Sequence, residues 1–160
     1  LRRQRQMCIR DRESMVEVYY NSGQFWHTLE YLVPFEKDAF TFYEKLGSFY
    51  EKKGYSEISH SRMRRYEILL EYLQEETDVP TEVAAQKMLY DLYLREKLKK
   101  RPVFAPDQKQ YETAVWNYRK NNQVSKTAHI EVFENGTVIL FDYEKRDPLS
   151  NNAYTEVVQL

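Results

Sequence analysis

The sequence predicts an α+β fold that is mostly helical, with five or six helices followed by a C-terminal β-hairpin. Apolar residues recur at helical spacing up to about residue 120, and the period then changes to the alternation that is typical of strands. Between two β-rich runs lies Glu134-Asn135-Gly136, and Asn-Gly is the strongest short-range indication of a hairpin. We therefore expect one domain over residues 13–160, helical over 13–121, with the hairpin and a tail over 127–160.

The composition is that of a globular protein with an unusual share of tyrosine. Of 160 residues, 42% are hydrophobic and 31% are charged, which is enough to bury a core. No apolar run approaches the roughly 18 residues that a membrane span requires, so no membrane segment is expected. The single cysteine excludes a disulfide framework and any site built from several thiolates. We expect a cytoplasmic protein.

Residues 1–12 stand apart from the rest of the chain because five of the twelve are arginine. A basic arm for nucleic acid is one interpretation. Translated backwards, however, residues 2–11 resemble in every codon the adaptor of transposase-based sequencing libraries, read in frame. We therefore interpret 1–12 as an adaptor-derived, disordered segment on a truncated gene, and expect the natural protein to extend upstream. The remaining residues, 13–160, contain 19 basic and 24 acidic side chains and carry a formal charge of −5.

Caps and breakers set the expected helix boundaries. Gly23 stops the first helix, Pro34 ends the second, and Gly54 follows the third where a left-handed C′ residue belongs. Hydroxyls at 59 and 61 suit the start of the fourth helix, and Thr81 is the expected N-cap of the fifth. The expected helices span residues 13–20, 24–33, 38–53, 62–76, 81–99 and 107–120.

The expected strands follow the last helix. They cover residues 128–133 and 137–143, with 154–160 as a possible third. An isolated hairpin is marginal in water, so we expect it to pack on the helices or on another strand. The many helical tyrosines have a structural explanation: the ring seals the edge of the core while the hydroxyl stays in water. The residues so interpreted are Tyr66, Tyr72, Tyr90, Tyr93, Tyr111 and Tyr118.

The best candidate binding residues lie at the start of the fourth helix. Backbone N–H groups at a helix N-terminus, together with arginine forks, favour an anion. The candidate anion or substrate contacts are Ser59, His60, Ser61, Arg62 and Arg65. A plain helix cap with a solvated basic face explains the same residues. Asn21 and Gln24, in a polar turn flanked by aromatics, are a second candidate pair, which a structural turn also explains.

No catalytic or metal site is predicted. The three histidines lie on different elements without ligand spacing, and no nucleophile elbow, Walker A loop or dinucleotide fingerprint occurs. With an acidic natural part, nucleic acid is not an expected partner, although Lys99, Lys100 and Arg101 would be its contacts.

Several short phrases, in order, resemble a known family. They are YYNSGQF at 19–25, SHSR at 59–62, YDxYLR at 90–95, FDY at 141–143, RDPL at 146–149 and NA at 152–153. Together they are similar to the C-terminal domain of unknown function of cobalamin-binding radical SAM proteins.

The resemblance implies a parent enzyme with an upstream cobalamin-binding domain and a radical SAM barrel. Its cofactors would be a [4Fe–4S] cluster, S-adenosylmethionine and cobalamin, with none held here, because the C-x-x-x-C-x-x-C and D-x-H-x-x-G motifs are absent. The expectation is a non-catalytic accessory domain that packs on those upstream domains. The alternative is a free-standing helical module that binds protein or RNA.

Overall fold

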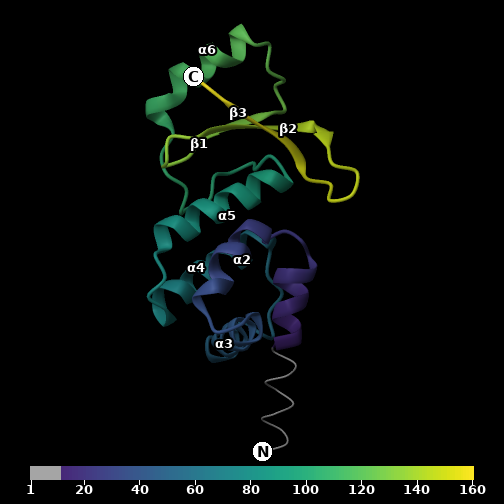
Figure 1. Cartoon of the computed structure of the whole chain (residues 1–160), viewed down its shortest axis with the longest axis vertical. Helices are drawn as coiled ribbons and strands as arrows, with labels where there is room; N and C mark the ends of the chain where they lie inside the picture. Colours follow the sequence, from purple (N-terminus) through teal and green to yellow (C-terminus); the bar gives the residue numbers. More distant parts are fainter. Residues whose placement is uncertain (1–11) are drawn as a thin grey trace, which may run out of the picture. The chain divides into compact units, whose positions relative to one another are not determined.

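The computed structural model describes residues 12–160 and confirms the α+β fold (Figure 1). The expectation that residues 1–12 are disordered falls almost wholly outside these residues, and Arg12 is already helical. The chain folds as two compact units, and the boundary between them falls inside helix α5 (Thr81–Arg95). Unit 1 ends at Met88, and unit 2 comprises Leu89–Leu160.

Unit 1 is helical throughout. Besides the first half of α5, its elements are the π-helix η1 (Val16–Asn21), α2 (Trp26–Leu32), the 3-10 turn η2 (Val33–Phe35), α3 (Ala39–Lys52) and α4 (Arg62–Glu76). One detail corrects the sequence-based expectation, because the helix expected over 13–20 is wound as a π-helix over Val16–Asn21. As expected, α2 ends just before Pro34. Pro34 then occupies an early position of the 3-10 turn η2, where its missing N–H costs no hydrogen bond.

Helix α3 has a side-chain cap at its start and the expected left-handed glycine after its end. Asp38 precedes α3 and its carboxylate accepts a hydrogen bond from Thr41 N at 2.7 Å. At the other end, Gly54 has φ +74°, and Tyr55 N donates to Tyr50 O at 2.8 Å. With Gly54 N donating to Glu51 O at 3.1 Å, these bonds form a Schellman motif.

Aromatic rings fill much of the core of unit 1. Phe25 stacks on Tyr66 at 4.1 Å between centroids, and Tyr19 meets Phe25 edge-on at 4.6 Å. The expectation of wet tyrosine hydroxyls is wrong for three residues: Tyr66 and Tyr72 here, and Tyr93 in unit 2, are all buried. Tyr66 instead donates its hydroxyl to Gln24 O. A buried hydroxyl needs such a partner, since leaving it without one costs about 1–3 kcal/mol.

All the strands found in residues 12–160 lie in unit 2. Its elements are the second half of α5, the 3-10 turn η3 (Lys109–Tyr111), α6 (Glu112–Asn121), β1 (His129–Val132), β2 (Val138–Arg146) and β3 (Ala153–Val158). The strands form one antiparallel sheet in the order β1-β2-β3, so the expected hairpin gains the third strand. The first turn is as expected, with Gly136 at φ +84°.

Two helix boundaries in unit 2 differ from those expected. Helix α5 ends at Arg95 rather than 99, where Arg146 Nη1 reaches the Arg95 carbonyl at 2.9 Å. The last helix begins at Glu112 rather than 107, because the 3-10 turn η3 precedes it. The Asp107 carboxylate accepts a hydrogen bond from Lys109 N at 3.0 Å, at the start of that turn.

The sheet of unit 2 is covered on both faces (Figure 1). On one face, Phe141 of β2 and Phe133, which directly follows β1, form a cluster with Leu89 and Tyr93 of α5. On the other face, residues such as Ile130 pack with residues of the α6 region. The α5–sheet–α6 layering therefore buries both sets of alternating side chains. Within residues 12–160, no helix is long and apolar enough to cross a membrane.

We expect Gly54→Ala to lower the free energy of unfolding by about 1 kcal/mol, because an L side chain at positive φ is strained. No atom lies within 4 Å of the added Cβ, so the cost is conformational rather than steric. Gly54→Asn is the matched control and should cost less, since asparagine tolerates this conformation. Urea denaturation measures both; equal losses would contradict the assignment.

Candidate functional site

The candidate anion residues lie at the start of α4, and most of their polar groups have partners within unit 1. Ser61 is the N-cap, and its hydroxyl accepts from Arg64 N at 3.1 Å. His60 Nε2 lies 2.9 Å from Tyr55 O. Arg62 is the first helical residue and is half-buried, while Ser59 is exposed. Helix capping is thus the role that the contacts assign to Ser61.

The arginines that follow face aromatic rings and carboxylates. Arg65 places its guanidinium carbon 5.2 Å from the Tyr50 ring centroid. Arg64 lies 3.4 Å from a carboxylate oxygen of Glu67 and 3.8 Å from one of Glu71. Binding of an anion by Ser59, His60, Ser61, Arg62 and Arg65 stays a prediction.

The second candidate pair lies in the turn after η1. Asn21 Nδ2 donates to Glu17 at 2.9 Å, and Gln24 N donates to Ser22 Oγ at 3.3 Å. Gln24 O accepts the Tyr66 hydroxyl, so this turn is fastened to α4 through its backbone.

A second tyrosine joins the same two segments. Tyr19 OH donates to Arg65 O at 3.0 Å and also hydrogen-bonds the Tyr50 hydroxyl. Burial, followed by the nearby Tyr50, raises the pKa of Tyr19 well above its usual value, so its hydroxyl keeps its proton. Tyrosine hydroxyls that bond to backbone carbonyls therefore hold the two candidate sets close together. The candidate side chains themselves do not line one common cavity.

Unit 1 also contains a groove of about 830 Å³ that the sequence did not reveal. It is formed by residues 12–21, by α2 and by the start of α3. Asn21 is the one candidate residue that lines it. Three exposed aromatic side chains line it as well, those of Tyr20, Trp26 and Phe40. Surface aromatics gathered in a concave, apolar site are typical of binding surfaces.

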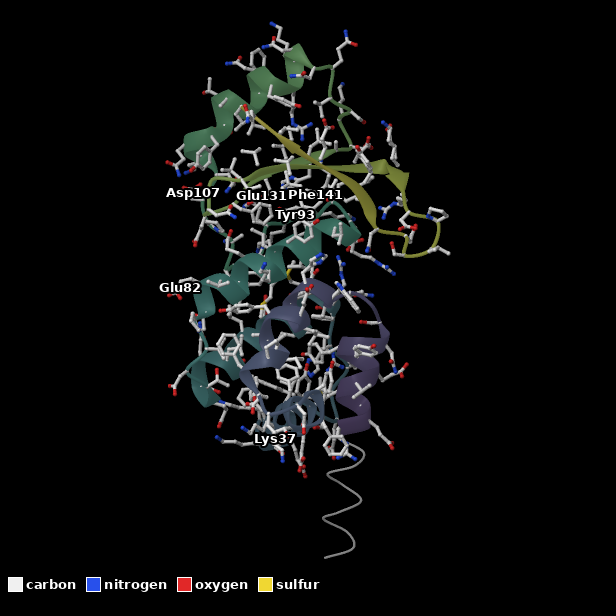
Figure 2. The ribbon with its side chains drawn as sticks, viewed as in Figure 1. Lys37, Glu82, Tyr93, Asp107, Glu131 and Phe141 are labelled. Carbon is white, nitrogen blue, oxygen red and sulfur yellow. The ribbon has the colours of Figure 1, made fainter. Side chains whose placement is uncertain are left out.

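Unit 2 contains a buried charged cluster. The Glu131 side chain is fully buried and receives both arms of the Arg101 guanidinium, at 2.6 and 3.0 Å. His129 Nε2 lies 2.9 Å from the same carboxylate, and its ring stacks on Tyr93 at 3.8 Å between centroids. Figure 2 shows Glu131, Tyr93 and Phe141 gathered between the sheet and α5.

The cluster controls the charge of its members. Burial alone would raise the pKa of the Glu131 carboxyl, but hydrogen bonds from His129 and Arg101 outweigh it, and the pKa lies below the usual value. Burial lowers the pKa of the His129 imidazole, and Glu131 offsets this only in part. Glu131 is therefore a carboxylate and His129 is neutral near pH 7. Because both Glu131 oxygens are buried and bonded, the cluster holds the fold rather than a substrate.

The sequence carries one signal for this cluster. Alternation alone places residues 129 and 131 on one face of the strand, which would be the solvent side if the strand were half-buried. Yet Phe133 and Phe141 share that side, which indicates a second buried face. Among residues 12–160, no group of three or more His, Cys, Asp or Glu side chains is placed to hold a metal ion.

Comparison with known proteins identifies a family. A family model described as "Protein of unknown function (DUF4080)" matches residues 6–145, beginning inside the adaptor-like segment and ending within β2. No curated protein and no solved structure matches the chain.

We expect Arg101→Met to lower the free energy of unfolding by about 3 kcal/mol, because it leaves the Glu131 carboxylate buried without its cation. Replacing both partners, Arg101→Met with Glu131→Leu, should recover much of the loss, since it removes the stranded charge. Chemical denaturation compares the unaltered chain, Arg101→Met and the double variant, and Lys100→Met is the control at an exposed residue. A double variant less stable than Arg101→Met would contradict this.

Stability should also fall as the pH drops below about 6.5, the usual pKa of histidine. With its pKa lowered in the fold, His129 takes up a proton more readily in the unfolded chain, and acid therefore favours unfolding. His129→Phe keeps a ring against Tyr93 and should flatten this loss. The measurement is urea denaturation of both chains at pH 7.5, 6.5 and 5.5, and parallel pH curves would contradict it.

Proposed function

Because the chain belongs to the DUF4080 family of proteins of unknown function, we propose that it is a non-catalytic accessory domain of a radical SAM/cobalamin-dependent enzyme. The support for this parent is the ordered series of phrases between residues 19 and 153, which resembles the C-terminal domain of such enzymes. The accessory role rests on the groove of unit 1, which has the apolar, aromatic lining of a surface that binds a polypeptide.

The cofactors of the parent do not fit this chain. A radical SAM cluster is held by three cysteine thiolates, and the chain has a single cysteine, in the adaptor-like segment. We assign the [4Fe–4S] cluster, S-adenosylmethionine and cobalamin to the upstream domains of the parent, which are the proposed partners. The proposal carries with it a cytoplasmic location.

A free-standing binding module is the second candidate, and the same groove favours its protein-binding form. RNA is the weaker partner, because the natural part carries a formal charge of −5 and would repel a polyanion. The two candidates differ in what precedes residue 13 in the intact gene.

The test is to recover the uninterrupted gene by sequencing that uses no transposase step. We expect an open reading frame upstream of Glu13 that contains a C-x-x-x-C-x-x-C motif. In the recovered enzyme, deletion of the segment that corresponds to residues 13–160 should leave the iron and sulfide content per chain unchanged. A reading frame without the cysteine triad would refute the parent, and loss of iron on deletion would refute the non-catalytic role.

A further inference from the structure

Three aromatic side chains that line the groove of unit 1 are more than half exposed to solvent. Tyr20, Trp26 and Phe40 are 55%, 59% and 55% exposed, although each lines the same concavity. They come from three elements, η1, α2 and α3, so the surface is continuous in space and not a single loose loop. Exposed aromatics grouped in this way are typical of surfaces that a partner covers.

The floor of the groove is apolar. Val16, Leu29 and Val33 line it together with the aromatic side chains. Leu29 is buried against the core of unit 1, which fixes the floor in place. The occupant therefore needs an apolar face of its own, because a fully polar segment would leave this floor without a complementary surface.

The rim of the groove is acidic. Glu13, Glu17 and Glu30 line it and are exposed. The Glu17 carboxylate accepts a hydrogen bond from the Asn21 side chain, which holds it at the rim. Three carboxylates around an apolar floor favour a cationic partner and oppose an anionic one, whether a phosphate backbone or an anionic lipid surface.

One cation of this chain, Arg12, contacts an aromatic ring of the groove. The guanidinium carbon of Arg12 lies 3.5 Å from the centroid of the Phe40 ring, which is a close cation–π contact. Arg12 belongs to the adaptor-like segment, so it stands in for an arginine that another polypeptide segment supplies.

We infer that this groove docks an amphipathic, arginine-bearing segment of the parent's catalytic part, apolar face inward and one arginine over Phe40. The identity of the supplier rests on the proposed function. The chemistry of the occupant does not, because it follows from the floor, the rim and the Arg12 contact. The acidic rim then sets the register of the segment by pairing with its flanking cations.

The experiment uses the full chain carrying Trp116→Phe, so that Trp26 becomes the sole tryptophan and reports on the groove. The probe is a synthetic amphipathic helix with leucine on one face and arginine on the other. The matched probe has glutamate in place of arginine. We expect the arginine peptide to shift the Trp26 emission saturably and the glutamate peptide to bind at least about tenfold more weakly.

Two variants locate the contact. Phe40→Ala should weaken binding of the arginine peptide by about tenfold, because it removes the cation–π face and part of the apolar lining. Phe35→Ala is the matched control, since Phe35 is 51% exposed, packs on Tyr31 and is not among the groove residues. Arg12→Ala should tighten binding a few-fold, because it removes the internal competitor for Phe40.

Equal binding of the two peptides, equal effects of Phe40→Ala and Phe35→Ala, or tighter binding of phosphatidylglycerol vesicles or poly(U) RNA would overturn the inference. Its failure is distinguishable from that of the proposed function. Docking of the arginine peptide to a chain whose gene lacks the cysteine triad would refute the parent alone. A cysteine triad in the gene without docking would refute the groove assignment alone.

Discussion

The structure depends on satisfying the hydroxyl groups of buried tyrosines. The chain has 14 tyrosines, and several lie fully inside it, where a hydroxyl without a partner would be costly. In unit 1, Tyr19 and Tyr66 each donate to a backbone carbonyl more than 40 residues away in sequence. In unit 2, the half-buried Tyr143 donates its hydroxyl proton to Tyr93 O at 2.6 Å, which fastens β2 to α5. In each case the ring supplies apolar area and the hydroxyl fixes the register of the segment it reaches.

Local signals predicted most of the secondary structure. The expected turn at Gly136, the left-handed Gly54 and the Ser61 cap are all present, because each depends on residues within one turn of chain. Boundaries that depend on distant partners were wrong. Arg95 ends α5 where Arg146 reaches its carbonyl, and nothing near residue 95 in the sequence indicates an arginine 51 residues later.

The functional features were predicted less well than the fold. A groove arises where η1, α2 and α3 meet, and the helical periodicity of each element says nothing about which exposed aromatics will converge. Tyr20, Trp26 and Phe40 were therefore assigned no role, although Asn21 was singled out beside them. The buried Glu131 was missed for a different reason: alternation identifies the two faces of a strand but not whether the second one is covered.

The outer edge of β1 is blocked by side chains. Gln108 uses both ends of its amide on Val132, donating to the carbonyl at 3.1 Å and accepting from the N–H at 3.0 Å, as a neighbouring strand would. Arg119 occupies the Ala128 carbonyl at the other end. Because β3 is the other edge of the sheet, a further strand would pair more readily along β3. Two copies that paired through β3 would both turn the obstructed β1 edges outward, which opposes further edge-to-edge growth into a fibril.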